Sequence, residues 1–247
     1  MKSTPKKKLV LITRPTADAD VFAAEMTTLG FTPFIEPMLG IIPTPYKAPD
    51  FKNYPAIVFT SANAVRVAGC PADNRDIAVF AVGAHTADEA RKQGYLRVFS
   101  TEGDGADLGA LIRKKLVGAE QKILHIRGEH VAVPLEDILL KDRIKTDALV
   151  VYTAKTEDNF TFACRAALEK GDIAAVTFFS KRTAENFVRL IKKEDLGVAL
   201  KPIKALCISQ AVLECVQSAS PGLVWGGAYS AERPDRPAML DLLKAAI

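Results

Sequence analysis

Three short segments of the sequence occur twice in the chain, and they are its strongest indication of the fold. In the first pair, an apolar run ends in arginine before a loop; the other two pairs couple an apolar run to a small residue. The pairs are 10–14 (VLITR) with 123–127 (ILHIR), 58–61 (VFTS) with 177–180 (TFFS), and 81–83 (AVG) with 207–209 (CIS). The order is the same in both halves, which is typical of a duplicated domain.

Short apolar runs alternate with amphipathic stretches along the whole chain. Residues 9–12 (LVLI) contain no polar side chain and predict a strand buried on both faces. Phe22, Met26 and Leu29 predict a helix that ends at Gly30. Further strands are predicted at 56–60, 77–82, 123–126, 148–152, 174–179 and 203–208, with helices at 108–116 and 184–191. This alternation predicts an α/β fold with parallel sheets flanked by helices.

Two segments occupy equivalent places in the two halves and are expected to be linkers. They are residues 40–45 (GIIPTP) and 149–154 (LVVYTA). The proline pair of the first segment favours extended backbone over helix. Near the carboxyl terminus, the proline- and charge-rich residues 228–237 predict a loop before a last helix, whose apolar face includes Met239 and Leu242.

Length and composition limit the class of protein. A chain of 247 residues is long for one domain and comfortable for two. No stretch approaches the roughly 20 apolar residues of a membrane helix, and residues 9–12 are too short for a signal-peptide core, so we expect a cytoplasmic protein. The net charge of +4 comes without a basic stripe interleaved with aromatics, which argues against nucleic-acid binding and suits an anionic small molecule.

The residue types that carry metal and cofactor chemistry lack the necessary spacing. Four cysteines (Cys70, Cys164, Cys207, Cys215) form no CxxC pair and are interpreted as buried structural thiols. His85, His125 and His130 have no metal-ligand spacing. The chain contains no P-loop, GxGxxG, GxSxG or HExxH motif, and the carboxylate pairs at 136–137 and 194–195 are interpreted as ordinary surface residues. We therefore expect neither a metal nor a cofactor.

The loops that follow the predicted strands are rich in hydroxyl side chains and glycine. They are residues 60–63 (TSAN), 83–86 (GAHT), 127–128 (RG) and 180–183 (SKRT). In doubly wound sheets, ligands bind at these strand ends, where helix amino termini receive carboxylates and phosphates. A serine or threonine after a strand also serves simply as a helix N-cap. Recurrence in both halves favours an anion-binding cleft between two lobes.

Together, these segments resemble the uroporphyrinogen-III synthase family from Leu9 onward. The resemblance is carried by the order and spacing of several weak motifs: 12–15 (ITRP), 58–65 (VFTSANAV), 82–87 with its VG and TA pairs, 123–128 (ILHIRG), 151–152 (VY), and 177–180 (TFFS) with 184–187 (AENF). The resemblance implies two similar flavodoxin-like lobes joined by a two-stranded linker. Residues 1–39 and 155–247 would form lobe 1 and residues 46–148 lobe 2.

The resemblance also implies the reaction. The expected substrate is hydroxymethylbilane, a linear tetrapyrrole with eight carboxylates; loss of its terminal hydroxyl leaves an electrophilic azafulvene that the substituted position of ring D attacks. The product would be uroporphyrinogen III, a precursor in haem, sirohaem and cobalamin synthesis. Because the pyrrole supplies the driving force, no cofactor is needed, and the protein's task is positioning. A monomer that makes at most transient contact with the preceding deaminase is expected.

By matching motifs, Tyr152 corresponds to the family tyrosine that helps the hydroxyl leave; from the residues alone, a linker tyrosine packing its ring is an equal alternative. Where some members carry threonines, this chain reads Ser209-Gln210, so Ser209 or Gln210 would substitute. The expected substrate-binding set is Arg14, Ser61, Ala62, Asn63, Gly83, Thr86, Arg127, Gly128, Ser180, Lys181, Arg182, Ser209 and Gln210. The arginines and the lysine would add charge-assisted bonds to carboxylates.

Two other functions fit the sequence pattern. One is a two-lobed nucleotide-sugar transferase, although such enzymes tend to be longer and no acidic residue is placed for a ribose. The other is a non-catalytic anion-binding module, such as a regulatory domain that keeps the synthase shape.

Overall fold

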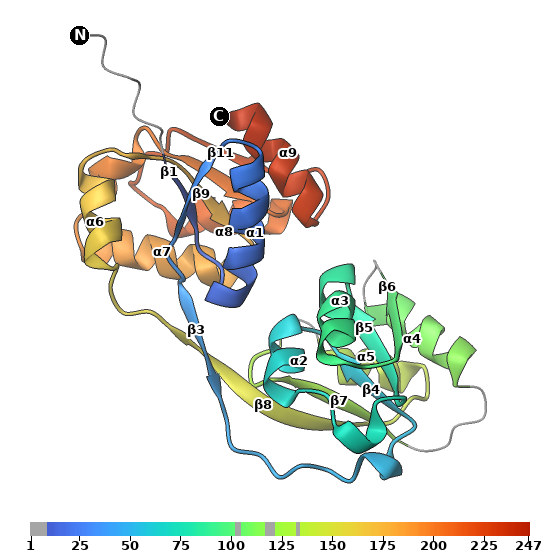
Figure 1. The fold of residues 1–247 in the computed structure, drawn as a ribbon. Coiled ribbons are helices and arrows are strands. Elements are labelled where there is room, and N and C mark those ends of the chain that lie inside the picture. Colours follow the sequence, from blue (N-terminus) through green and yellow to red (C-terminus); the bar gives the residue numbers. More distant parts are fainter. Residues whose placement is uncertain (1–8, 102–104, 117–121, 132–133) are drawn as a thin grey trace. The chain divides into compact units, whose positions relative to one another are not determined.

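A computed structural model describes residues 9–101, 105–116, 122–131 and 134–247. The chain forms two compact units: unit 1 comprises Met1–Gly40 and Lys155–Ile247, and unit 2 comprises Ile41–Ala154. The basic residues 1–8 lie outside the described part. Figure 1 colours the chain by residue number and labels the elements.

Unit 1 is built on a five-stranded sheet with the order β11-β10-β9-β1-β2, in which every pairing is parallel. Numbered along the chain within the unit, this order is 5-4-3-1-2, the flavodoxin-like doubly wound order. Its elements are β1 (Leu9–Ile12), α1 (Thr16–Thr28), β2 (Thr32–Ile35), α6 (Phe162–Glu169), β9 (Ile173–Phe178), α7 (Lys181–Lys193), β10 (Lys204–Cys207), α8 (Gln210–Ala219), β11 (Gly227–Ser230) and α9 (Arg236–Ala246).

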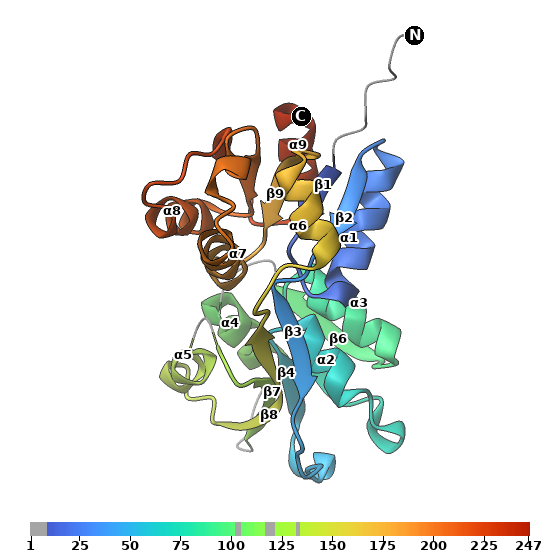
Figure 2. The same cartoon turned by 90° about the vertical axis from the view of Figure 1, so that its left-hand side faces the viewer.

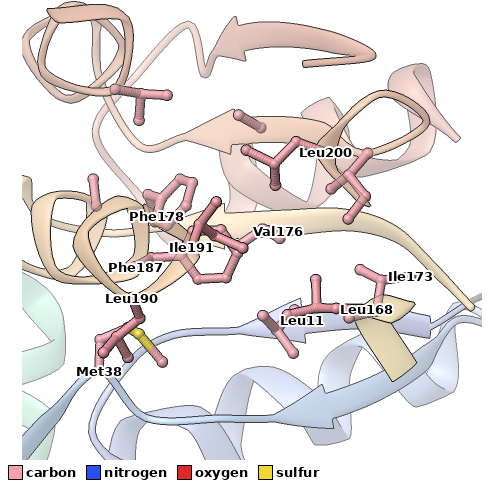
Figure 3. Close-up of a cluster of buried hydrophobic side chains, with 14 of the residues drawn as sticks. Leu11, Met38, Leu168, Ile173, Val176, Phe178, Phe187, Leu190, Ile191 and Leu200 are labelled. Carbon is pink, nitrogen blue, oxygen red and sulfur yellow. The ribbon is translucent and has the colours of Figure 1, made fainter. Parts of the chain in front are cut away.

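Helices cover both faces of the unit 1 sheet (Figure 2). Helices α6, α7 and α8 pack on one face against Leu11, Val176 and Phe178. Helices α1 and α9 pack on the other face against Val10 and Ile12. Consecutive residues of β1 therefore face opposite layers, which is why the run at 9–12 has no polar position. Figure 3 shows the first of these layers, with Phe187, Leu190 and Ile191 of α7 directed toward the strands.

Unit 2 is built on a six-stranded sheet with the order β3-β8-β7-β4-β5-β6. The pairings from β8 through β6 are parallel. Helices α2 and α3 cover one face, and α4 and α5 cover the other. The elements are β3 (Leu39–Pro43), β4 (Ala56–Phe59), α2 (Ala62–Ala68), β5 (Ala78–Val82), α3 (Ala84–Gln93), β6 (Arg97–Thr101), α4 (Gly105–Lys115), β7 (Ile123–Gly128), α5 (Leu135–Lys141) and β8 (Thr146–Thr156).

The three repeated segments occupy matching places in the two sheets. Strand β1 corresponds to β7, β9 to β4 and β10 to β5, and each set lies side by side in its own sheet in the same order. Aligned in this way, β2 corresponds to β8 and β11 to β6. The sequence repeat therefore matches a repeat of strand order. Unit 2 additionally carries β3 at one edge of its sheet.

The expected linkers, 40–45 and 149–154, are largely paired strands of unit 2. The unit boundaries fall inside β3 and β8. Glu157 N–H donates to the Met38 carbonyl (3.1 Å) and Thr44 N–H to the Val151 carbonyl (2.9 Å), so β3 and β8 run in opposite directions. Strand β8 also pairs with β7 as far as Tyr152. Residues 149–152 thus belong to the sheet of unit 2.

Asn186 of α7 holds the two chain crossings together at unit 1. Its side-chain amide is buried and donates to the carbonyls of Met38 (2.8 Å) and Glu157 (3.1 Å). Arg189 donates to the same Glu157 carbonyl (2.6 Å) and to the Asn186 Oδ1 (2.9 Å). The segment at 184–187 therefore has a structural function in the described part of the chain, namely fixing the ends of β3 and β8.

One sequence expectation for the carboxyl terminus was wrong in part, since residues 231–235 do form a loop. Residues 228–237 were expected to be a loop, but Gly227–Ser230 forms β11, parallel to β10. Without β11, the outer edge of β10 would leave its backbone groups unpaired, and the GAYS segment pairs with them without needing an apolar run. The last helix agrees with expectation, since Met239 is buried and Leu242 packs against the same cluster.

Candidate functional site

The residues expected to form a site in unit 2 lie at one edge of its sheet. Ser61 follows β4, Gly83 follows β5, Gly128 ends β7, and Tyr152 lies on β8. Strands β8, β7, β4 and β5 are consecutive neighbours and parallel, so their carboxyl ends meet at the same edge. Ser61 and Tyr152 lie 91 residues apart along the chain, and the sheet brings them together.

Tyr152 makes two close contacts at this edge. Its hydroxyl donates to the Ser61 Oγ at 3.2 Å. Its ring lies against the backbone of Gly128, where an added Cβ would stand 2.5 Å from Cζ and 2.9 Å from the hydroxyl oxygen. Only glycine leaves room for the ring, because real Cβ contacts do not come this close. Three of the expected site residues therefore form one cluster, which we call the tyrosine cluster: Ser61, Gly128 and Tyr152.

The neighbouring positions at the start of α2 are engaged within the protein. Ser61 is the N-cap of α2 and accepts from the Asn63 N–H at 3.2 Å. The Asn63 Oδ1 accepts from Arg66 (2.9 Å), which is also paired with Glu89 (3.1 Å). Ala62 is buried. Ser61 thus caps α2 and contacts Tyr152 at the same time, because its hydroxyl oxygen accepts hydrogen bonds from both the Asn63 N–H and the Tyr152 hydroxyl.

The second strand-end loop of unit 2 begins at Gly83. This residue has φ +78° and is the N-cap of α3, a conformation that favours glycine. Its N–H donates to the Thr101 carbonyl at 2.9 Å. Thr86, expected to be a hydroxyl facing a ligand, lies in the first turn of α3 and is 5% exposed. The structure therefore places Gly83 at the sheet edge and Thr86 mostly beneath the surface.

In unit 1 the expected binding residues follow three adjacent strands, β1, β9 and β10. The Arg14 guanidinium pairs with Asp18 (3.1 Å) and lies 4.3 Å above the Phe179 ring, so Arg14 reaches the end of β9. Ser180 caps α7 through the Thr183 N–H (3.2 Å). Lys181 and Arg182 form the first turn of α7, with Lys181 exposed and Arg182 half-buried.

The strand-end loop after β10 differs from the other serine loops. Within the part of the chain that the structure describes, the Ser209 side chain makes no cap hydrogen bond to α8, although Ser209 occupies the N-cap position. Gln210 is exposed and bonds to Glu214 (3.3 Å) and Ser230 (3.4 Å). Ser209 is therefore the strand-end serine at which capping does not compete with ligand binding.

Sequence reasoning missed a polar network, centred on a buried histidine, beside the tyrosine cluster. His125 is completely buried in β7, with Nδ1 3.0 Å from the Glu136 Oε1 and Nε2 3.3 Å from the Thr60 Oγ1. Arg127 donates to the same Glu136 oxygen (3.0 Å) and to the carbonyls of Gly128 (3.0 Å) and Glu129 (3.2 Å). We call Thr60, His125, Arg127 and Glu136 the histidine network. The alternation of Ile123, His125 and Arg127 along a strand was the available signal, because it puts all three on one face.

The charges in this network are set by burial and by its neighbours. Burial lowers the pKa of His125, and this outweighs the opposite effect of Glu136. Burial raises the pKa of Glu136, but a hydrogen bond from its own backbone, the His125 side chain and Arg127 together hold that pKa below its ordinary value. A neutral imidazole therefore faces a carboxylate and a guanidinium.

Three expectations about isolated residues need correction. Glu136 and Glu194 were interpreted as ordinary surface carboxylates, yet Glu136 binds His125 and Arg127, and the Glu194 side chain is 8% exposed and accepts from the Phe160 N–H and Arg165. Of the four free cysteines, Cys164 and Cys207 are buried, whereas Cys70 and Cys215 are only partly so. Such differences arise because burial depends on partners distant in sequence.

Among the described residues, no group of three or more histidine, cysteine or carboxylate side chains could hold a metal ion. In the same part of the chain, no helix combines the length and apolar character needed to cross a membrane.

The fold and the strand-end residues define a class: a duplicated α/β protein with hydroxyl, glycine and basic positions gathered at the carboxyl edges of its parallel sheets. A family model described as uroporphyrinogen-III synthase HemD matches residues 20–241. The chain therefore belongs to the uroporphyrinogen-III synthase family, which confirms the resemblance inferred from its sequence. That enzyme is a cyclising lyase of tetrapyrrole biosynthesis.

Individual relatives agree with this assignment. The chain is 23% identical over 223 residues to the porphyrin biosynthesis protein HemD of Ruminiclostridium josui, covering 84% of this chain but 43% of that protein. It is 26% identical over 204 residues to the uroporphyrinogen-III synthase of Chlorobaculum parvum, covering 77% of this chain and 82% of that protein. The crystal structure of uroporphyrinogen-III synthetase from Helicobacter pylori 26695 has the same fold, with a TM-score of 0.66, 20% identity and coverage of 96% and 99%.

Proposed function

We propose that this chain cyclises hydroxymethylbilane to uroporphyrinogen III, with loss of water and inversion of ring D. The observation that carries the proposal is the family match across residues 20–241, which includes strand-end loops of both units. A nucleotide-sugar transferase receives no support from these similarities. The non-catalytic anion-binding module is excluded only by turnover, so the test must measure the product.

Tyr152 is proposed to assist departure of the substrate's terminal hydroxyl. Support comes from its hydroxyl, which is held at the sheet edge by Ser61 at 3.2 Å. Both groups are hydroxyls whose protons rotate to suit their partners. When Tyr152 turns its O–H toward the leaving hydroxyl, Ser61 is able to donate in return to the tyrosine oxygen. This exchange keeps the phenol oxygen hydrogen-bonded while it supports general-acid assistance.

The substrate's carboxylates are proposed to bind the strand-end residues of each unit. In unit 2 these are Ser61, Ala62, Asn63, Gly83, Thr86, Arg127 and Gly128; in unit 1 they are Arg14, Ser180, Lys181, Arg182, Ser209 and Gln210. Backbone N–H groups at the starts of α3, α7 and α8 and basic side chains are suited to carboxylates. Arg127 is a weaker member, because its guanidinium already serves Glu136 and two loop carbonyls.

We further propose that the protein acts as a cytoplasmic monomer of two lobes joined by β3 and β8, meeting the preceding deaminase transiently. Support for the monomer comes from the scatter of exposed apolar side chains such as Leu96, Phe162 and Val198 over different elements. Sedimentation that gives a dimer at micromolar concentration would contradict the monomer without touching the proposed reaction.

The decisive experiment supplies enzymatically generated hydroxymethylbilane and separates the type III product from the type I isomer that forms spontaneously. The wild-type protein is expected to give type III product, and Tyr152→Phe to lower kcat by about 10²-fold, the order that general-acid assistance contributes. Tyr46→Phe, an exposed tyrosine of the same unit, is the matched control. A type I background without type III product contradicts the synthase proposal, whereas an unchanged rate in Tyr152→Phe removes that residue from the mechanism.

A further inference from the structure

The histidine network has a fixed hydrogen-bond direction. The Glu136 carboxylate can only accept, so His125 donates to it through Nδ1–H at 3.0 Å. A neutral imidazole carries one N–H, so Nε2 accepts from the Thr60 hydroxyl at 3.3 Å. Arg127 donates to the same carboxylate oxygen. The donor and the acceptor of each bond are thus fixed, and rotating any of these side chains breaks at least one of the bonds.

One end of the network fixes the segment that carries Ser61. Backbone pairing between β4 and β7 reaches Phe59 and Ile126 in the described register. Thr60 is the next residue of the first strand, and its side chain is tied to His125 beyond that pairing. Thr60 immediately precedes Ser61, whose Oγ accepts a hydrogen bond from the Tyr152 hydroxyl. The position of Ser61 therefore depends on a hydrogen bond made on the other face of the sheet.

The other end fixes the segment that supports the Tyr152 ring. Arg127, oriented by Glu136, donates to the carbonyls of Gly128 and Glu129. Gly128 is the residue against which the ring packs, and Glu129 N–H donates to the Tyr152 carbonyl at 2.8 Å. Both neighbours of the phenol, Ser61 and Gly128, are thus held by one pair, the buried imidazole of His125 and the partly buried carboxylate of Glu136.

We propose that His125 and Glu136 are positioning residues for Tyr152, acting through Thr60–Ser61 on one side and Arg127–Gly128 on the other. His125 is 0% exposed and cannot touch a substrate, so it is not itself a catalytic residue. The effect of His125 and Glu136 on turnover rests on the proposed function of Tyr152. Their effect on the geometry of Tyr152 does not.

The test uses isosteric variants of the full-length chain. Thr60→Val removes the donor to His125 and keeps the side-chain shape. His125→Asn places its amide N–H near the Nδ1 position and loses the acceptor for Thr60, whereas His125→Gln carries an amide oxygen to the Nε2 position and is expected to restore that bond. His130→Gln, an exposed histidine five residues further along, is the control. Thermal unfolding establishes which variants are folded, and Thr60→Val keeps the test decisive where a His125 variant does not fold.

The first measurement reports geometry alone. Labelling tyrosine with ¹³C at Cζ gives signals for the five tyrosines, and Tyr152→Phe identifies the one from Tyr152. Thr60→Val and His125→Asn are expected to shift this signal in the direction that Ser61→Ala does. His125→Gln should return it toward the wild-type position, and His130→Gln should leave it in place. A Tyr152 signal that is unchanged in folded Thr60→Val and His125→Asn overturns the inference.

The second measurement connects geometry to turnover. Misplacement of a catalytic group acts on the chemical step, so kcat should fall about tenfold in Thr60→Val and His125→Asn, with KM changed less than about twofold. In the Tyr152→Phe background, the same substitutions should have almost no further effect on kcat, because the group they position is gone. If the signal shifts while kcat stays unchanged, the positioning inference stands and the catalytic role of Tyr152 fails.

Discussion

The position of the Tyr152 side chain depends on the absence of a side chain at Gly128. The phenol ring occupies the space in which any other residue at 128 would place its Cβ, and the Ser61 Oγ accepts a hydrogen bond from the phenol O–H. Sequence order separates Tyr152 from Gly128 by a helix and a strand, and the register of β7 with β8 brings them face to face. Position 128 therefore requires glycine because of the tyrosine ring on the neighbouring strand, and not because of its own backbone conformation.

Gly128→Ala is expected to displace the Tyr152 ring. The added methyl would stand 2.5 Å from Cζ, and the ring can relieve this contact by swinging away from Ser61. We expect kcat to fall at least as much as in Tyr152→Phe, with about 1–3 kcal/mol lost in stability, the usual cost of overpacking. Steady-state kinetics and denaturant unfolding check both. Retention of full activity would mean that the ring position is unimportant.

The buried His125 predicts a pH dependence of stability. Because burial lowers its pKa below the ordinary value of 6.5, the unfolded chain binds a proton at a higher pH than the folded protein does. The contribution of the neutral His125 to the free energy of unfolding is therefore fully present above pH 6.5. It is lost as the pH falls from there toward the pKa of His125 in the folded protein. Two charged groups face the imidazole: Glu136 of α5, which binds His125 directly, and Arg127 of β7, which binds Glu136.

The measurement compares the melting temperature of the wild type and His125→Asn from about pH 8 to about pH 5. On acidification, the melting temperature of the wild type should fall further than that of His125→Asn. The difference between the two melting temperatures should therefore narrow at low pH. Burial raises the pKa of Glu36, which acts in the opposite sense, but Glu36 is present in both proteins and its effect cancels from the difference. Parallel curves would contradict the assignment of a neutral, buried imidazole.

At the scale of elements, the strand-end serines divide into two kinds. Ser61 and Ser180 accept from backbone N–H groups of the helices that they begin. Ser209 holds the same N-cap position before α8 without a cap hydrogen bond from its side chain in the described structure. The sequence pattern of a serine after a strand is the same in all three cases, so it cannot separate capping from binding.

A matched pair of substitutions separates the two functions. Ser180→Ala should cost about 1 kcal/mol of stability, because it removes a cap from α7. Ser209→Ala should change stability by less than about 0.5 kcal/mol, as other substitutions without a structural partner do. If Ser209 binds substrate, its variant raises KM without lowering the melting temperature. An unchanged KM at an unchanged melting temperature removes Ser209 from the binding set.

At the scale of the whole molecule, each hydrophobic core belongs to one unit. The clusters around Phe187 and Phe22 contain residues of unit 1, and the clusters around Phe59 and Phe80 contain residues of unit 2. Unit 2 is continuous in sequence. Unit 1 is not, because β1 comes from the amino-terminal segment and lies between β9 and β2.

This difference predicts opposite behaviour of two fragments. Residues 41–154 expressed alone should fold and melt cooperatively, because strands β4–β8 and both cores of unit 2 are present. Residues 155–247 alone should not fold, because β9 would lose its neighbour β1 and half of the apolar layer under α9. Circular dichroism and thermal melts check both fragments. A cooperative transition in residues 155–247 would show that β1 is dispensable.

Much of the molecule followed from the sequence because local patterns report local forces. Apolar runs located β1, β4, β5, β7, β9 and β10, since strands buried on both faces have few polar positions. The apolar run at 148–152 also located β8, although only Val151 of that strand is buried. The repeated segments predicted matching strands, and their order predicted the family. Strands β2, β6 and β11 escaped because they are edge strands, in which Pro33 of β2 and polar residues of the others are tolerated.

The tertiary structure alone decided which residues meet. The sequence pattern presents His125 as a strand residue and Glu136 as a surface carboxylate, yet β7 and α5 bring them into a hydrogen-bonded pair with the imidazole buried. Likewise, the contact between Tyr152 and Gly128 follows from the register of two strands. Periodicity along a chain records which face a residue takes, because burial acts on each residue separately; hydrogen bonds and steric contacts act between residues, and their partners become fixed only when strands pair and helices pack.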